Sequence, residues 1–294
     1  MRVLLGRGDA VPSSAQTFEF NGASYRGTFQ RLDDGQIVDI VDLEEYLYSV
    51  VSREMPASWP GAALGAQAIC ARTYVLQRSD PRRSYDLVPS EVDQVYEGIA
   101  GETPAGVAAV DATRTGVLAF GAGFAQIAYS SCCGGHTESS SDAWGNASIP
   151  YLEGVVCTSC SASPNYRWTR SLDLNAIAVR LSQQLPLGSG LDDVRIVARD
   201  GSGRARSFEL VTDRGSALVS GSAFRRGVGL RVLPSLLLAD VRRDGGALLV
   251  DGAGLGHGVG LCQWGARGMA LTGRGAPDIL TFYFPGTVLK NLNA

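Results

Sequence analysis

The hydrophobic and polar positions between residues 41 and 78 predict two helices joined by a short turn. Apolar residues recur at helical spacing from residue 43 to residue 51. Asp42 stands where an N-cap residue belongs, and Glu45 three residues later completes a capping-box pattern. The first helix should end near Pro56, because the residue before a proline is pushed out of the α region. A capped amphipathic helix is therefore expected here.

The second helix is expected at residues 60–78, since a proline is tolerated in the first turn of a helix. Gln67, Ala71 and Tyr74 would line one stripe of this helix, because their spacing returns to the same helical face. Arg72 flanks the stripe. We therefore expect a polar edge of the second helix to face the same cleft as Glu54.

The turn itself carries one carboxylate, Glu54. A carboxylate at the mouth of a helical hairpin can be partly desolvated and still be reached by a substrate, which a general acid requires. A glutamate after a helix is, however, most often a solvated surface residue. The residues alone leave both interpretations open.

The rest of the chain predicts short strands with a few helices. Residues 1–41 alternate apolar and polar positions around Gly and Asp-Gly turns, which is typical of a small antiparallel sheet. Further helices are expected at residues 104–115 and 174–185, and a strand hairpin at residues 116–120 and 125–131. The predicted fold class is α+β, with the helical hairpin packed against small, mostly antiparallel sheets.

The domain organisation predicted from this pattern is a single unit over residues 1–294. The pattern also allows a division into a core, residues 1–168 plus 251–294, and a β-rich subdomain of residues 169–250. With 45% hydrophobic residues the chain can bury a large core.

The net charge and the hydropathy of the chain argue against a nucleic-acid partner and against a transmembrane helix. The net charge is −3 and no Lys/Arg run occurs, which argues against a nucleic-acid partner, whose phosphates need a basic face. No stretch approaches about 18 uninterrupted apolar residues, so no transmembrane helix is expected. The chain has the size of a globular enzyme.

Four cysteine and histidine residues have the spacing of a metal site. Cys157 and Cys160 form a C-x-x-C pair, and Cys133 with His136 forms a C-x-x-H pair earlier in the chain. Two such pairs predict a tetrahedral zinc site, and a full shell of four protein ligands would make the zinc structural. Cys132 could replace Cys133 or His136, and a metal without His136 could instead be catalytic. The alternative is a Cys157–Cys160 disulfide.

The segment 254–269, GLGHGVGLCQWGARGM, is rich in glycine. Its glycines allow the backbone to approach a sugar closely around His257, while Gln263 and Trp264 offer an amide and a stacking face. A lone histidine is more often structural than catalytic. The segment lacks the G-x-G-x-x-G spacing of nucleotide sites, and Cys262 is more simply a small buried residue than a nucleophile.

Three blocks of the sequence resemble, in order, the stage II sporulation protein D family, which includes the LytB-type amidase enhancers. They are EEYLYSVVSREMP with AQAICARTY, SSCCGGHTES with PYLEG and NYRW, and GHGVGLCQWGARGMA. With DQVYEG and FRRGVGLRVLPS between them, the resemblance covers essentially the whole chain. The chain departs from the family pattern at Cys70, where alanine is more usual, and at the doubled Cys132-Cys133. Neither change removes a residue that the implied chemistry needs.

The resemblance implies a lytic transglycosylase that acts on peptidoglycan, with Glu54 as its catalytic residue. Such an enzyme manages with one carboxyl group, which first protonates the leaving oxygen and then takes the proton of the muramyl C6 hydroxyl. The product ends are 1,6-anhydro-MurNAc. A raised pKa would keep Glu54 protonated at the start, and Asp93, Glu138 and Asp142 remain candidates for a second carboxylate.

The expected substrate contacts are polar or aromatic residues from the three blocks and the stretch between them. They are Gln67, Arg72, Tyr74, Gln94, Ser131, His257 and Gln263. Two rival functions stay open: a non-catalytic glycan-binding protein that enhances a separate amidase, and a zinc-dependent peptidoglycan hydrolase. The expected partners are therefore peptidoglycan strands and a cell-wall amidase.

The resemblance also implies a location outside the cytoplasm, in the cell envelope or secreted. The first ten residues, MRVLLGRGDA, lack the long apolar region of a secretory signal. We therefore expect a signal sequence to have been removed from this chain.

Overall fold

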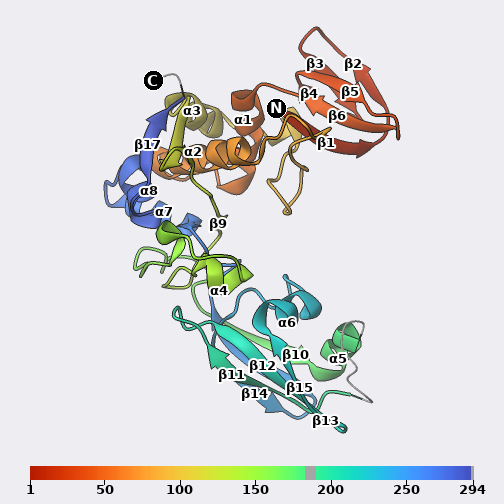
Figure 1. Ribbon diagram of the computed structural model, residues 1–294, viewed down its shortest axis with the longest axis vertical. Helices are drawn as coiled ribbons and strands as arrows, with labels where there is room; N and C mark the ends of the chain where they lie inside the picture. The colour runs from red at the N-terminus through yellow and green to blue at the C-terminus, as the bar shows by residue number, and fades with distance from the viewer. Residues whose placement is uncertain (183–189, 293–294) are drawn as a thin grey trace. The chain divides into compact units, whose positions relative to one another are not determined.

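The computed structural model describes residues 1–182 and 190–292 (Figure 1). As predicted, the fold is α+β: the described residues form eight α-helices and several small, mostly antiparallel sheets. The chain divides into two compact units. The first unit contains residues 1–128, 269–281 and 286–292, and the second unit contains residues 129–268 and 282–285.

The N-terminal part of the first unit forms two antiparallel sheets instead of the single one predicted for residues 1–41. Each has three strands, in the orders β1-β6-β5 and β2-β3-β4. Phe18, Phe20 and Ile37 form a small apolar core there. The strands are β1 (Arg2–Arg7), β2 (Ala10–Pro12), β3 (Thr17–Phe20), β4 (Ala23–Arg26), β5 (Thr28–Arg31) and β6 (Gln36–Ile40).

The predicted helical hairpin is confirmed as α1 (Leu43–Glu54) and α2 (Gly61–Arg78). The carboxylate of Asp42 accepts hydrogen bonds from the backbone N–H groups of Glu44 at 2.8 Å and Glu45 at 3.4 Å, which caps α1 as expected. Both helices pack with each other and with α3 (Pro104–Ala112), which follows the short 3₁₀ helix η1 (Gly98–Gly101).

The last strands of the first unit differ from the prediction. Strand β7 (Gly116–Phe120) pairs with β8 (Gly123–Phe124) and with β17 (Val288–Asn291), which follows α8 (Ala276–Tyr283). The predicted strand at residues 125–131 is wrong except at its end. A tight turn brings β8 back onto β7 first, and Tyr129–Ser130 forms a separate strand, β9, of the second unit.

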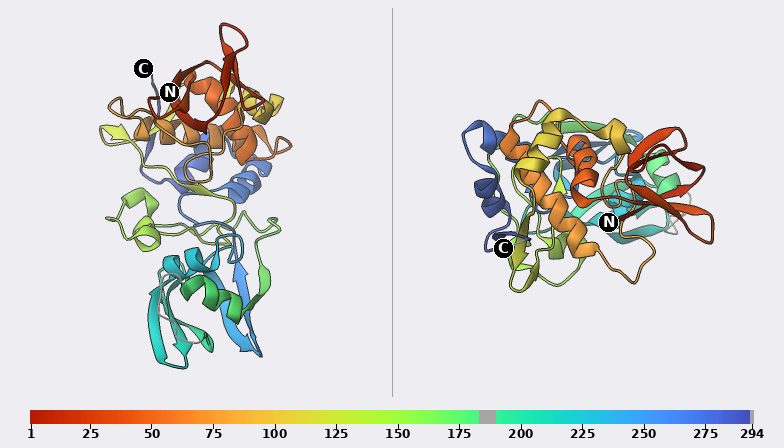
Figure 2. Two further views of the ribbon diagram at one scale, coloured as in Figure 1. Left: turned by 90° about the vertical axis from the view of Figure 1, so that its right-hand side faces the viewer. Right: turned by 90° about the horizontal axis from the view of Figure 1, so that it is seen from above.

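The second unit is built around two further antiparallel sheets, ordered β10-β15-β14 and β11-β12-β13 (Figure 2). Helices α5 and α6 pack on them, and the apolar core includes Trp168, Phe208, Phe224 and Leu248. These elements are β10 (Trp168–Asp173), α5 (Leu174–Ser182), β11 (Asp193–Arg199), β12 (Ala205–Thr212), β13 (Gly215–Ser220), α6 (Gly221–Val228), β14 (Leu237–Asp244) and β15 (Ala247–Ala253). Residues 183–185 of the predicted helix 174–185 lie outside the described residues.

The second unit also holds the cysteine-rich and glycine-rich segments, which the predicted division placed with the hairpin. Strand β10 starts at Trp168 opposite Gly252, and the Trp168 indole N–H donates to the carbonyl of Gly254 at 2.8 Å. This pairing joins the glycine-rich segment to the β-rich residues. The remaining elements are α4 (Ser140–Trp144), η2 (Pro150–Leu152), β16 (Leu261–Cys262) and α7 (Gln263–Leu271).

Among the helices of the described residues, none combines the length and apolar character needed to cross a lipid bilayer.

A buried carboxyl group in the first unit gives the fold a pH-dependent component. Asp39 in β6 is fully buried, and the hydroxyl of Tyr96 donates to its Oδ2 at 2.8 Å. Burial raises the pKa of Asp39 to about 7, although the hydrogen bond from Tyr96 opposes this shift. The folded protein therefore holds a proton on Asp39 at pH values where the unfolded chain has released it.

We predict that this proton makes stability fall as the pH rises from about 4 to about 7, by about 1.4 kcal/mol per pH unit. Below the unfolded-state pKa of about 4 the contribution is fully present, because both states are protonated. Urea unfolding of the wild type and of Asp39→Asn at several pH values measures it. The variant should have a shallower decline than the wild type, and equal slopes would contradict the prediction.

Candidate functional site

Glu54 lies at the end of α1, in the turn between the two helices of the hairpin. It is the last residue of the helix, and its side chain is half-buried. Met55, which follows, has extended backbone and is buried, so Pro56 ends the helix as expected. The carboxyl group is thus fixed by a helix end while remaining partly open to solvent.

A buried polar network between α1, α2 and residues 93–94 contains two of the predicted contact residues. The Tyr46 hydroxyl donates to Gln94 Oε1 at 3.1 Å, and Gln94 Nε2 donates to the carbonyl of Ala71 at 3.3 Å. The Tyr74 hydroxyl donates to Asp93 Oδ1 at 2.9 Å. These side-chain hydrogen bonds attach residues 93–94 to α1 and α2.

Electrostatics connect Glu54 to this network. Burial raises the pKa of the Tyr46 phenol well above its usual value, and the groups of Asp93, Tyr74 and Glu54 raise it further. The Glu54 carboxylate therefore acts on the same phenol as Asp93.

Arg72 has a structural role and does not line an open surface as predicted. Its side chain is fully buried and forms a two-point ion pair with Glu44, at 2.9 Å and 2.6 Å. Its guanidinium also donates to the carbonyl of Gly116 at 2.9 Å. These contacts tie α1, α2 and β7 together, and breaking such a buried pair costs about 3–5 kcal/mol. Gln67, on the same helix, is also fully buried.

Four buried cysteines of the second unit form a group that could hold a metal ion. The sulfur atoms of Cys133, Cys157, Cys160 and Cys262 all lie within 4.8 Å of one another. None of the four is in a disulfide, so the alternative Cys157–Cys160 bridge is absent. The Cys133 and Cys160 sulfurs are 3.7 Å apart. Four thiolates at tetrahedral corners around zinc would be about 3.8 Å apart, so this donor set fits the metal.

Hydrogen bonds to the sulfur atoms support this group. The backbone N–H groups of Cys133 and Gly265 donate to Cys262 Sγ at 3.2 Å and 3.3 Å, and the Tyr283 hydroxyl lies 3.1 Å from Cys157 Sγ. A Cβ atom on Gly265 would lie 2.8 Å from Cys157 Sγ, so this position requires glycine for close packing. Such contacts around the ligands orient them and balance thiolate charge.

The fourth member of the group is Cys262 and not His136, which the sequence predicted as a metal ligand. The His136 ring is outside the group, and its Nδ1 lies 2.6 Å from the carbonyl of Thr137. Cys132 is also outside it and pairs through its backbone with Leu255. Spacing could not select Cys262, because the parallel pairing of β16 with β9 brings it in from a distant part of the chain.

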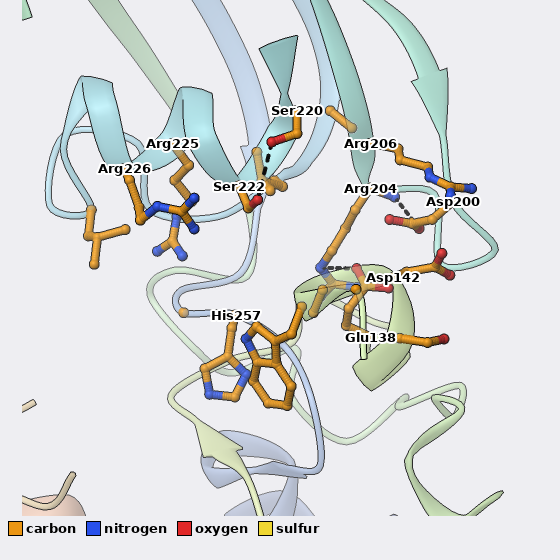
Figure 3. A pocket seen from close by; sticks show the side chains of 18 residues that line it. Glu138, Asp142, Asp200, Arg204, Arg206, Ser220, Ser222, Arg225, Arg226 and His257 are labelled. Atoms are coloured by element: carbon orange, nitrogen blue, oxygen red, sulfur yellow. Dashed lines mark hydrogen bonds and ion pairs between the residues drawn. The ribbon is translucent and has the colours of Figure 1, made fainter. Parts of the chain in front are cut away.

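His257 lies at a cavity of about 510 Å³ in the second unit (Figure 3). Its Nε2 lies 2.9 Å from the carbonyl of Tyr129, and its Nδ1 accepts from the N–H of Val259 at 3.0 Å. Desolvation by the surrounding protein lowers the pKa of His257 to about 4, although the bond to Tyr129 opposes this. The imidazole is therefore neutral at physiological pH, with a hydrogen on Nε2. The Trp144 ring lies 5.3 Å from the His257 ring.

The other two predicted contacts of the second unit are close to the cysteine group in sequence. Gln263 is buried at the start of α7, directly after Cys262. Ser131 is half-buried, and its carbonyl accepts from the N–H of Trp264 at 3.0 Å. This bond connects the loop after β9 to α7.

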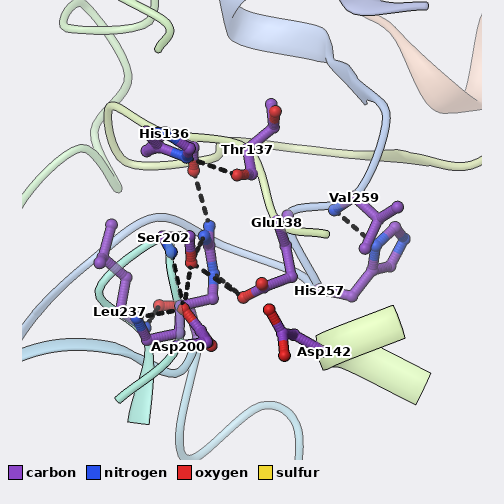
Figure 4. A network of polar contacts seen from close by, with 12 residues as sticks. His136, Thr137, Glu138, Asp142, Asp200, Ser202, Leu237, His257 and Val259 are labelled. Atoms are coloured by element: carbon purple, nitrogen blue, oxygen red, sulfur yellow. Dashed lines mark hydrogen bonds and ion pairs between the residues drawn. The ribbon is translucent and has the colours of Figure 1, made fainter. Parts of the chain in front are cut away.

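A buried ion pair that was not predicted holds the cysteine loop to β12 (Figure 4). Arg204 Nε lies 3.3 Å from Glu138 Oε2, and the guanidinium donates to the carbonyls of Cys133 and His136 at 2.9 Å and 3.0 Å. Burial raises the pKa of Glu138 to about 7, with Arg204 opposing the shift. Glu138 is 2% exposed and Arg204 3%, so both support the loop from inside.

Comparison with known proteins places this fold and these motifs in a family. A family model described as Stage II sporulation protein matches residues 33–120, which include the hairpin. A second one, Domain of unknown function (DUF8618), matches residues 157–260.

Three curated relatives match most of the chain. An uncharacterized protein of Brachyspira hyodysenteriae is 32% identical over 284 residues, covering 94% of this chain and 75% of that protein. Stage II sporulation protein D of Bacillus subtilis is 28% identical over 278 residues, 88% of this chain and 77% of that protein. Amidase enhancer of Bacillus subtilis is 30% identical over 294 residues, covering 83% of this chain but 40% of that protein. The chain belongs to the stage II sporulation protein D family.

The cysteine group predicts which substitutions remove a bound metal. Cys262→Ser should lose most of the metal, because serine replaces one of four soft ligands with a poor one. Cys70→Ser is the matched control, since Cys70 is a buried free cysteine outside the group. Inductively coupled plasma mass spectrometry of the purified proteins measures the metal content. Loss of metal in His136→Ala together with retention in Cys262→Ser would contradict this ligand set.

Proposed function

We propose that the protein is a lytic transglycosylase that cleaves peptidoglycan between N-acetylmuramic acid and N-acetylglucosamine, leaving 1,6-anhydro-MurNAc ends. The observation that carries this proposal is the position of Glu54. A half-buried carboxyl group stands at a helix end in the EMP motif of a stage II sporulation protein D family member. Family membership supplies the cell-wall context.

The local geometry suits a single carboxyl group that acts first as acid and then as base. Glu54 is the last residue of α1 and is half-buried, so the helix end holds its carboxyl group while a substrate can still reach it. Protonated Glu54 would donate its proton to the leaving glycosidic oxygen. The resulting carboxylate would take the proton from the C6 hydroxyl, whose oxygen bonds to C1 and closes the anhydro ring without consuming water.

Residues of each unit are proposed to contact the glycan. In the first unit we assign this role to Tyr74, whose hydroxyl donates to Asp93. In the second unit we assign the same role to His257, Ser131 and Gln263. Gln67, Arg72 and Gln94 are fully buried and are better explained as supports of α2.

The cysteine group is proposed to bind zinc in a structural role. Four thiolates would fill the tetrahedral shell of a zinc ion and would leave no position for an activated water. A zinc-dependent hydrolase is therefore the less well supported alternative. Because peptidoglycan lies outside the cytoplasmic membrane, we propose an extracytoplasmic location.

A non-catalytic role with a cell-wall amidase is the second candidate function. The likeness to a relative named Amidase enhancer, at 30% identity, favours it. In that case the same surfaces would bind glycan strands without cleaving them.

We predict that Glu54→Gln lowers glycan cleavage by about 100-fold or more, because removal of a general acid–base group typically costs this much. Purified glycan strands are incubated with wild type and variant, and product ends are identified by mass spectrometry. Glu45→Gln is the matched control, since it changes another glutamate of α1.

The outcomes separate the three functions. Anhydro-muramyl ends that depend on Glu54 but not on Glu45 support the lytic transglycosylase. Binding of strands without cleavage by either protein supports the amidase enhancer. Reducing ends or peptide products that a chelator abolishes, while Glu54→Gln stays active, would point to the zinc hydrolase.

A further inference from the structure

The cavity beside His257 has one strongly cationic end. Arg225 and Arg226 of α6 point into it on the same side (Figure 3). Arg225 is held in place, because its Nε and Nη2 donate to the carbonyls of Leu233 at 2.9 Å and Pro234 at 2.7 Å. Arg226 is exposed to solvent.

The surroundings of Arg225 lack a compensating negative charge. Burial, and secondly the charge of Arg204, lower the pKa of Arg225 to about 10. Within the described part of the chain no carboxylate is among the groups that shift this pKa. A half-buried guanidinium destabilised by another cation gains free energy when an anion binds next to it.

The acidic residues of the cavity lie at its other end, and two of them are already engaged. Glu138 pairs with Arg204 at 3.3 Å. Asp200 Oδ1 accepts from the N–H groups of Ser202 at 2.9 Å and Arg204 at 3.0 Å. Figure 3 shows Glu138, Asp142 and Asp200 across the cavity from Arg225 and Arg226. The arginine end is therefore free to bind an anion.

An aromatic surface lies beside the cationic end. Trp144 is the last residue of α4, lines the cavity and is 48% exposed. Its ring contacts the ring of His257. That imidazole is neutral and is hydrogen-bonded to the backbone of Tyr129 and Val259. A fixed, exposed indole offers a flat apolar face on which a pyranose ring can stack.

We propose that this cavity binds an acidic sugar, with the sugar ring on Trp144 and its carboxylate on Arg225 and Arg226. The inference rests on the proposed function, since it names the part of the glycan that the second unit binds. In peptidoglycan the carboxylate has two sources: the lactyl group of N-acetylmuramic acid and the stem peptide attached to that group. The cavity volume of about 510 Å³ accommodates one sugar with its substituent.

The test is a binding titration of the wild-type chain with sugars that contain no cleavable MurNAc–GlcNAc bond. N-acetylmuramic acid, neutral N-acetylglucosamine and muramyl dipeptide, in which an amide replaces the lactyl carboxylate, are added separately. NMR follows the indole N–H of Trp144, assigned by its loss in Trp144→Phe. We expect N-acetylmuramic acid to bind at least about tenfold more tightly than N-acetylglucosamine, because a charge-assisted contact is added.

Arg226→Ala should abolish this preference, and Arg214→Ala should keep it. Arg226 is exposed and its loss should not disturb folding, whereas Arg214 is an exposed arginine outside the cavity and serves as the control. Tighter binding of N-acetylmuramic acid than of the dipeptide assigns the lactyl carboxylate, and the reverse order assigns the stem peptide. Equal affinity for the acidic and neutral sugars, or an unchanged preference in Arg226→Ala, would overturn the sugar site.

This result is independent of catalysis. Selective binding of N-acetylmuramic acid by a protein whose wild-type form cleaves no glycan would support the sugar site and overturn the lytic activity. Cleavage of glycan without sugar selectivity would overturn the sugar site alone.

Discussion

The convergence of four cysteine thiols is the constraint on which the second unit depends. Cys133 follows β9, Cys157 and Cys160 form one turn after η2, and Cys262 ends β16. Three segments that are distant in sequence must therefore meet at one point. A bound metal would couple the folding of these segments to its own binding. Arg204 adds a second tie, since it donates to backbone carbonyls of the loop that carries Cys133.

The first unit contains two separate clusters of polar side chains. The Glu44–Arg72 pair is buried and joins the two helices to β7, so it acts as scaffold. In the second cluster, Tyr46 of α1 donates to Gln94, and Tyr74 of α2 donates to Asp93. Glu54 belongs to this second cluster electrostatically, although it stands at the end of a helix whose remaining buried residues are structural. A single hairpin therefore carries both a buried scaffold and the carboxyl group that we propose to be catalytic.

Local signals in the sequence predicted the hairpin well, because its determinants lie within a few residues of each other. The Asp42 cap and the two prolines place both helices almost to the residue. Long-range contacts could not be predicted in this way. Cys262 enters the cysteine group through strand pairing, and no spacing rule connects it to Cys160.

Side-chain direction was the other source of error. The predicted stripe of α2 placed Ala71 and Tyr74 on one face, and both contact residues 93–94. Arg72, in contrast, turns toward Glu44 and is buried away from solvent. An arginine beside a polar stripe has the same pattern whether it binds substrate or a buried carboxylate. The cationic cavity could not be predicted from the sequence either, because Arg225 and His257 line the same cavity only after the second unit has folded.

The central claim is that Glu54 drives a cleavage in which water takes no part. The most direct measurement is digestion of purified glycan strands in water enriched in oxygen-18, followed by mass spectrometry of the products. A lytic transglycosylase should give anhydro ends that carry no oxygen-18, because the C6 oxygen of the sugar itself attacks C1. Reducing ends that contain one oxygen-18 atom would contradict the claim, since they would show that water had attacked the glycosidic bond.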